Sequence, residues 1–201
     1  MSHKPLHSLF IASIGNPGRY RNTRHSAGHV LLDAIIPLLR TQLPPVYKTW
    51  HSPSLMNDSG KKLIRELEAF KRINHPETNA GALTLVILHD ELEKPMGKIV
   101  VKRGGPEKLS LRGHNGLKDI FKWLEKKKMY PHDPTLSILR IGLGIGRPES
   151  RGSDDVAKYV LTPMEERDLD AVKRAAGFAV DVLVEEAGSA KVINPAPRPT
   201  A

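Results

Sequence analysis

The sequence predicts a single-domain α/β fold in which a mixed β-sheet is flanked by helices. Two observations predict this class. Short apolar runs alternate with longer segments of helical periodicity, which is typical of proteins with a largely parallel or mixed sheet. The length of 201 residues suits one domain, and no internal repeat or change in composition divides the chain. We therefore expect one domain over residues 1–190 and a disordered tail over residues 191–201.

The first strand is predicted at residues 9–15, where the run LFIASIG is mainly apolar. The next residues, NPG, predict a turn, because proline fixes φ and glycine permits positive φ. Residues 27–43 place apolar side chains on one helical face, and Pro37 is expected to kink that helix. Residues 44–60 are predicted to be irregular. A second, amphipathic helix is predicted at 61–73, with an apolar face made of Leu63, Leu67, Phe70 and Ile73.

Two further strands are predicted at residues 83–92 and 97–103, joined by a short turn that contains Pro95 and Gly97. A loop at residues 104–113 precedes a helix at 114–128.

The last two elements are a strand at residues 136–146 and a helix at residues 162–188. For that helix we expect a capping box of Thr162 and Glu165, with Pro163 at the first helical position and Gly188 at the end.

The composition limits the possible functions. The formal net charge is +9 and the pI is about 9.8, which suits either simple solubility or an anionic partner such as nucleic acid. Only four Phe, four Tyr and two Trp are present, which argues against a broad stacking platform for single strands. The lack of cysteine excludes disulfides, thiolate nucleophiles and cysteine-bound zinc, and favours an intracellular protein. No membrane helix or presequence is recognised, so the cytoplasm and the mitochondrion are the expected compartments.

Candidate catalytic residues follow the predicted strands. Asn16 comes after the first strand and Asp90 closes the run at 83–92, so both are expected at one rim of the sheet. His25 lies between that first turn and the following helix. A lone histidine is more often a surface or capping residue, but a carboxylate can hold one imidazole nitrogen and leave the other free to accept a proton. Because no cysteine or G-x-S-x-G serine is available, such a base would act on water. No spacing of metal ligands is evident, and no metal or cofactor is expected.

Asparagines at turns form a second group of candidates. Three asparagines lie at predicted turns that contain glycine or proline: Asn16, Asn57 and Asn115. Any one of them is explained by the preference of asparagine for turns. Together they suggest amide groups that line a cleft.

Several segments together resemble one family. The segments SIGNPGRYRNTRHSAGHVLLD, SLMNDSGK, LHDELEKPMGKIVVKRGG, GHNGLKDI, LRIGLGIGRP and VAKYVLTP occur in this order. They are similar to the bacterial-type peptidyl-tRNA hydrolases, from about residue 9 to about residue 190. The resemblance implies a three-layer α/β/α domain, and an enzyme that hydrolyses the ester between a peptide and the 3′ end of tRNA. It also implies a monomer that needs no metal or cofactor and binds the acceptor stem and 3′ end of peptidyl-tRNA.

The resemblance assigns roles to individual residues. His25 would be the general base on water, Asp90 would orient it, and Asn16 would contact the peptide near its first amide. Asn115 would be catalytic and would also bind substrate. The remaining substrate-binding positions would be Tyr20, Leu55, Met56, Asn57, Gly113 and His114. Lys102 and Arg140 would clamp the tRNA 5′-phosphate.

The chain departs from the family pattern at four places. Ser26 replaces the usual asparagine, so the amide interaction of that asparagine is expected to be missing. Leu55 stands where phenylalanine is common. The segment 46–54 is short, which predicts the loss of one or two strands. The loop at 106–112 is longer than usual and is expected to form a mobile lid with Lys108 and Arg112.

Two alternatives remain beside the hydrolase. One is an RNA-binding relative of the same fold without turnover, as in splicing cofactors, because fold alone does not decide function. The joint presence of His25, Asp90, Asn16 and Asn115 favours the enzyme. The other is a hydrolase of small esters, which the net charge and the basic run KKK at 126–128 argue against.

Overall fold

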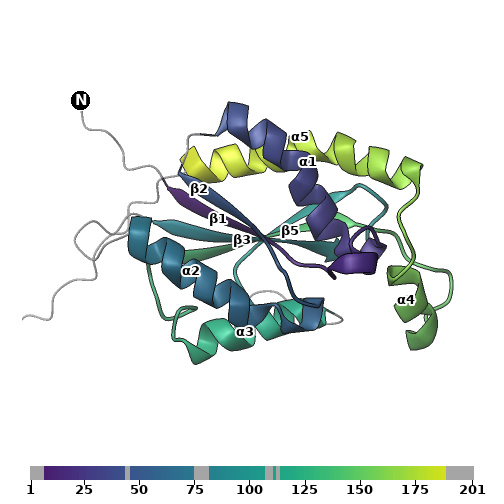
Figure 1. Ribbon diagram of the computed structural model, residues 1–201, viewed down its shortest axis with the longest axis horizontal. Helices are drawn as coiled ribbons and strands as arrows, with labels where there is room; N and C mark the ends of the chain where they lie inside the picture. Colours follow the sequence, from purple (N-terminus) through teal and green to yellow (C-terminus); the bar gives the residue numbers. More distant parts are fainter. Residues whose placement is uncertain (1–6, 44–45, 75–81, 107–110, 112–113, 189–201) are drawn as a thin grey trace, which may run out of the picture.

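The computed structural model describes residues 7–43, 46–74, 82–106, 111 and 114–188. Its centre is a five-stranded sheet in the order β2-β1-β3-β5-β4 (Figure 1). The strands are β1 (Ser8–Ser13), β2 (Tyr47–His51), β3 (Leu83–Glu91), β4 (Ile99–Arg103) and β5 (Leu136–Gly144). All neighbouring pairs are parallel except β4 with β5. The predicted α/β class with a mixed sheet is therefore confirmed.

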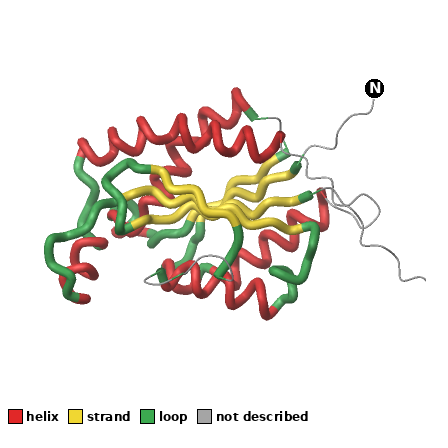
Figure 2. Tube along the Cα trace, turned by 180° about the vertical axis from the view of Figure 1, so that it is seen from behind, coloured by secondary structure: helices red, strands yellow, loops and turns green. Residues whose placement is uncertain are grey.

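Helices cover both faces of the sheet, which gives three layers. The helices α1 (Ala27–Gln42) and α5 (Glu166–Gly188) lie on one face, and α2 (Gly60–Asn74) and α3 (Asn115–Lys126) lie on the other. The short helix α4 (Ser153–Val160) stands at the end of the sheet. Figures 1 and 2 show this arrangement from opposite sides.

Each central strand is buried on both faces. In β1, Leu9 and Ile11 pack in the layer of α1 and α5, whereas Phe10 and Ala12 pack in the layer of α2 and α3. A strand buried in this way needs apolar side chains at every position, which explains its continuous apolar run. Among the described residues, no helix is long and apolar enough to cross a membrane.

The prediction that residues 44–60 are irregular was wrong. Residues 47–51 form β2, which pairs in parallel with β1 at the edge of the sheet. All five of its residues are only partly buried, so the strand needs no continuous apolar run. The short segment 46–54 thus retains a strand.

The predicted start of the last helix was also wrong. α5 begins at Glu166, and Asp168 rather than Thr162 provides the cap, because its Oδ2 accepts a hydrogen bond from the Glu165 N–H at 3.1 Å. The Thr162 hydroxyl instead donates to the Tyr159 carbonyl at 2.7 Å. Pro163 lies outside the helix, in an isolated bridge to Thr23. Sequence patterns also missed α4, which buries none of its residues fully.

The remaining predicted elements lie close to their expected positions, with one exception in α2. Ile73 is 79% exposed and does not join the apolar face, where Ile64 is buried instead. Pro37 lies inside α1, which runs through it to Gln42. Lys108, Arg112 and Gly113 lie outside the described residues, as does the expected tail at 191–201.

Candidate active site

The candidate site lies where β1 and β3 end. The two strands are parallel neighbours, and Ser13 pairs with Leu88 at the end of their register. Their carboxyl ends therefore share one rim of the sheet, where Asn16 and Asp90 lie. Asp90 is 5% exposed and Asn16 is 8% exposed, so both side chains are held inside the protein.

His25 approaches Asp90 from the short helix η2 (Arg24–Ser26), which leads directly into α1. Its Nδ1 lies 3.0 Å from Asp90 Oδ2. Gly28 makes this approach possible, because a Cβ at that position would lie 2.4 Å from the Leu88 carbonyl oxygen of β3. With Nδ1–H donating to the carboxylate, Nε2 of His25 is the proton-accepting nitrogen. The His25 side chain is 25% exposed, so solvent reaches part of the ring.

Asp90 sets the protonation of His25. Burial lowers the pKa of His25, but the hydrogen bond and the negative charge of Asp90 outweigh burial and raise that pKa above 6.5. Burial also acts on Asp90 and raises its pKa. The charges and hydrogen bonds of His114 and His25 are stronger, and they hold the pKa of this carboxyl well below its usual range. Asp90 is therefore ionised at neutral pH.

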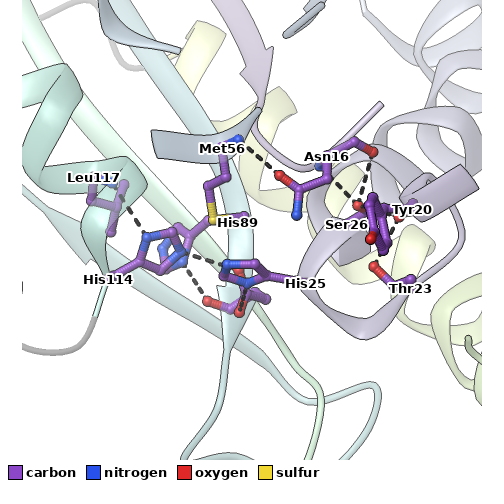
Figure 3. Close-up of polar contacts among 10 residues, drawn as sticks. Asn16, Tyr20, Thr23, His25, Ser26, Met56, His89, His114 and Leu117 are labelled. Carbon is purple, nitrogen blue, oxygen red and sulfur yellow. Dashed lines mark hydrogen bonds and ion pairs between the residues drawn. The ribbon is translucent and has the colours of Figure 1, made fainter. Parts of the chain in front are cut away.

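His114 occupies the second oxygen of the same carboxylate. Its Nε2 lies 3.2 Å from Asp90 Oδ1, and its Nδ1 accepts a hydrogen bond from the Leu117 N–H at 3.3 Å. Because Nδ1 is an acceptor, Nε2 bears the proton and donates to Asp90. Figure 3 shows His25, His89 and His114 gathered in this region, with Asn16 and Met56 beside them. Sequence reasoning expected His114 to bind substrate and missed its bond to Asp90.

His89 forms the inner wall of this cluster and was not among the predicted residues. Its Nδ1 lies 2.7 Å from the Asp90 backbone carbonyl, and its ring meets His114 edge-on at 4.9 Å. Burial, followed by the charge of His114, lowers the pKa of His89 to about 3. His89 is therefore neutral at neutral pH. It contacts the backbone carbonyl of Asp90, whereas the carboxylate of Asp90 interacts with His25 and His114.

The loop that bears His25 is anchored at its back by Arg24. The Arg24 Nη2 lies 2.7 Å from Asp168 Oδ2 of α5, with both side chains largely buried. The same guanidinium lies 4.9 Å from the centre of the Tyr159 ring of α4. The Arg24 N–H also donates to the Thr162 carbonyl at 3.0 Å. The segment from α4 to α5 thus fixes the position of His25, although no sequence pattern indicated it.

Asn16 is held on two sides by hydrogen bonds, one to its side chain and one from its backbone N–H. Its side-chain Oδ1 accepts a hydrogen bond from the Met56 N–H at 2.9 Å, and its own N–H donates to the Ser26 hydroxyl at 2.9 Å. The Ser26 hydroxyl in turn donates to the Tyr20 carbonyl at 2.7 Å. Ser26, where the sequence predicted only a missing amide, is therefore an internal brace between Asn16 and the loop that bears His25.

We expect Ser26→Ala to destabilise the protein by about 1–3 kcal/mol, because the buried N–H of Asn16 would be left without its acceptor. Urea denaturation should show a lower midpoint with an unchanged slope. Ser153→Ala, at the exposed start of α4, is the matched control and should change stability by no more than about 0.5 kcal/mol. Equal effects of the two substitutions would contradict the bracing role of Ser26.

The other expected substrate-binding residues surround this group. Met56 is buried, and its Cγ would lie 2.5 Å from a Cβ at Gly116, so the short helix η3 (Met56–Asp58) packs tightly on the start of α3. Asn57 and Asn115 are exposed near this contact, and Leu55 is 54% exposed. Tyr20 is half-buried and accepts a hydrogen bond from Arg19. Among the described residues, no three His, Asp or Glu side chains are arranged to hold a metal ion.

The expected phosphate clamp is only partly accessible. Lys102 and Arg140 are register partners on β4 and β5. Lys102 is part-exposed, and its Nζ lies 2.6 Å from Glu91 Oε2. Arg140 is 1% exposed, with its guanidinium 5.9 Å from the centre of the Phe121 ring. The burial of Arg140 argues against direct contact with a phosphate in this conformation, whereas Lys102 remains within reach of solvent.

Comparisons with known proteins bear on the family. The model of the family described as peptidyl-tRNA hydrolase matches residues 10–197. A probable peptidyl-tRNA hydrolase of Schizosaccharomyces pombe is 34% identical, with 81% of this chain and 75% of that protein covered. Peptidyl-tRNA hydrolase 2 of Corynebacterium glutamicum is 32% identical, with 92% of this chain and 86% of that protein covered.

A solved structure agrees in fold. The Arg119Gln mutant of peptidyl-tRNA hydrolase from Acinetobacter baumannii superposes with a TM-score of 0.63 and 23% identity. The match covers 98% of this chain and 100% of that one. At this identity the superposition shows the fold, and the family model with the two relatives shows the family. The chain belongs to the peptidyl-tRNA hydrolase family.

Proposed function

We propose that this chain hydrolyses the ester bond between a peptide, or an N-blocked amino acid, and the 3′ end of tRNA, with His25 as the general base. The observation that carries the proposal is the bond between His25 Nδ1 and Asp90 Oδ2, 3.0 Å long, on a ring whose side chain is partly open to solvent. Membership of the family supports the substrate class.

In the proposed reaction, Nε2 of His25 takes a proton from water while the water oxygen attacks the ester carbonyl carbon. Asp90 stabilises the imidazolium that forms. The tetrahedral oxyanion then collapses, the bond to the ribose oxygen breaks, and the proton on Nε2 passes to that oxygen. A positioned base contributes about 10²–10⁴-fold, and each donor aimed at the oxyanion about 10²–10³-fold.

We assign the surrounding side chains as the resemblance implied. Asn16 would contact the peptide, and Asn57 and Asn115 would hold the substrate and the water or the oxyanion. Tyr20, Leu55 and Met56 would border the peptide. His114 would also bind substrate, and we add a positioning role for it, because its Nε2 lies 3.2 Å from the carboxylate that holds His25.

The test is the release of an N-acetylaminoacyl group from tRNA by the purified protein. The hydrolase proposal predicts multiple turnovers without an added cofactor. Binding of tRNA without release would instead favour the RNA-binding relative of the same fold. Equal turnover of a small ester that lacks RNA would favour the small-ester hydrolase.

We expect the activity to depend on salt. The net charge of +9 and the part-exposed Lys102 predict phosphate contacts, and each contact releases counterions on binding. KM for the tRNA substrate should therefore rise as the salt concentration increases, with a slope of about 0.9 per contact in a plot of log KM against log salt concentration. KM that stays constant between low and physiological salt would contradict phosphate binding.

A further inference from the structure

A basic surface runs along the outer sides of α2 and α3. Residues 60–74 and 115–128 contain ten lysines and arginines but only four acids. That excess equals six of the nine net positive charges of the chain. The exposed cations are Lys61, Lys62, Arg65, Arg72, Lys118, Lys122, Lys126, Lys127 and Lys128. This set is called the α2/α3 basic surface below.

The acids of these helices neutralise little of this charge. Asp119 uses its Oδ2 to accept the Gly60 N–H at 2.8 Å, which ties the two helices together. Glu66 pairs with Lys48 of β2 at 3.1 Å and with Arg65 at 3.5 Å, and Glu68 pairs with the exposed Lys127 at 3.3 Å. Such pairs at the surface are weak in water. Cations therefore remain in excess over acids on this surface, and such an excess attracts polyanions.

A shallow cavity of about 260 Å³ lies in the middle of this surface. Trp123 of α3 and Ile64 of α2 provide its apolar lining, and the rest is charged: Lys61, Lys62, Arg65, Glu68 and Lys127. The indole of Trp123 is fixed, because it packs on Gly60 so closely that a Cβ there would lie 2.7 Å from Trp123 Cδ1. Lys126 Nζ lies 4.7 Å from the centre of the Trp123 ring. Cations around a half-buried aromatic ring suit the phosphates and sugars of a nucleic acid.

The basic surface begins at the candidate active site. Both helices have their first residues at the rim that holds His25, because η3 leads into α2 and His114 caps α3 (Figure 1). Lys118 Nζ lies 3.4 Å from Asn115 Oδ1, so one cation links the two regions. From Lys61 to Arg72 the cations extend about 16 Å along α2, at 1.5 Å per residue.

We propose that the α2/α3 basic surface binds the phosphate backbone of the substrate's tRNA, in the part that adjoins the 3′ end held in the active site. This inference rests on the proposed function, because it takes the RNA end to lie beside His25. The positive charge of this surface is complementary to the phosphates of RNA. Because the surface extends from the catalytic rim along α2 and α3, an RNA whose 3′ end lies at the rim would run along these two helices. Such contacts recognise the backbone and carry no base sequence.

The test removes three exposed charges together, in a variant with Lys62→Gln, Arg65→Gln and Lys122→Gln. A matched control with Arg40→Gln, Lys173→Gln and Arg174→Gln removes three exposed charges from α1 and α5 on the opposite face of the sheet. Two substrates are compared: full-length N-acetylaminoacyl-tRNA, and the same ester on a short oligonucleotide with only the 3′-terminal tRNA sequence. Binding of uncharged tRNA is measured in parallel.

We expect the test variant to raise KM for the full-length substrate by roughly tenfold near physiological salt, with kcat unchanged. The salt slope should fall by about one for each phosphate-binding cation that is replaced. With the short substrate, the test variant should have the wild-type KM. The control variant should have the wild-type KM with both substrates. Unchanged KM and unchanged tRNA binding would overturn the proposal and leave the surface to another partner, such as an acidic protein. An equal loss with both substrates would also overturn it, because the effect would then arise in the active site.

The result also separates this inference from the proposed function. If wild type binds tRNA but hydrolyses neither substrate, the proposed function fails. The basic surface is then judged by binding alone. Weaker tRNA binding by the test variant than by the control variant would still support it, and equal binding would reject it.

Discussion

Replacing His25 by alanine should lower the turnover of N-acetylaminoacyl-tRNA by about 10²–10⁴-fold, the contribution of a positioned general base. The physical reason is that neither of the two imidazoles beside it, those of His89 and His114, can take its place. His89 is buried and has a pKa lowered to about 3. The Nδ1 of His114 already accepts the Leu117 N–H, and its Nε2 faces Asp90. The assay is the single-turnover rate with saturating enzyme, which separates chemistry from binding.

The structure offers a matched control for this substitution in His51. Its Nε2 lies 2.9 Å from Asp33 Oδ1, so it is a second histidine paired with an aspartate, but its partner is half-exposed, whereas Asp90 is buried. His51→Ala should keep the wild-type rate to within a few fold. The affinity of His25→Ala for tRNA should equal that of wild type. A His25→Ala variant with undiminished rate would remove His25 from the mechanism.

The sequence could predict the rim residues because two rules of parallel sheets fix them. Apolar runs located β1 and β3, and the carboxyl ends of adjacent parallel strands must meet. Asn16 and Asp90 follow from that alone. The place of His25 depended on a close approach at Gly28, which is visible only once α1 lies against β3.

The misses share a physical cause. β2 lies at the sheet edge with every residue partly buried, so it left no continuous apolar run in the sequence. The start of α5 was misjudged because Thr162 and Asp168 both have capping chemistry, and only the bridge of Pro163 to Thr23 decides between them. Local propensity cannot reveal a choice that tertiary contacts make.

The same limit applies to the candidate site. The expected role of His114 in substrate binding gave no sign of its bond to Asp90, which depends on a tautomer fixed by a backbone N–H one turn later in α3. Comparison with the family pattern indicated only that Ser26 lacks the amide of the usual asparagine. In the structure its hydroxyl accepts the Asn16 N–H and donates to the Tyr20 carbonyl. Arg140 is buried against Phe121, which no property of its strand sequence indicates. Residue types in a pattern give candidates for chemistry, whereas the partners of each polar atom assign its role.

Replacing Asp90 by asparagine should lower kcat by up to about 10⁴-fold, the loss that the same change causes in a Ser-His-Asp triad. The amide cannot stabilise the imidazolium that forms as His25 takes the proton. The affinity for tRNA should change little, since Asp90 is 5% exposed. A parallel loss of kcat and of tRNA affinity, with a lower urea midpoint, would instead assign Asp90 a structural role.

The pH profile of this variant gives the sharper test. General-base catalysis needs neutral His25, so wild-type activity should fall as the pH drops through the pKa of His25, which Asp90 raises above 6.5. In Asp90→Asn the negative charge is gone while burial still lowers that pKa. The acid limb should therefore move to lower pH, even as the maximal rate falls. An unmoved limb would mean that Asp90 does not set the protonation of His25.

His114→Asn should move the acid limb in the opposite direction. His114 donates to Asp90 Oδ1 and is among the groups that hold the pKa of Asp90 down. Without that donor the carboxylate keeps more of its negative charge for His25, so the pKa of His25 rises and the limb moves to higher pH. A merely structural defect at either position would lower the rate without moving the two limbs in opposite directions. Opposite shifts would therefore show that one buried carboxylate is shared between two histidines, and that this sharing tunes the base.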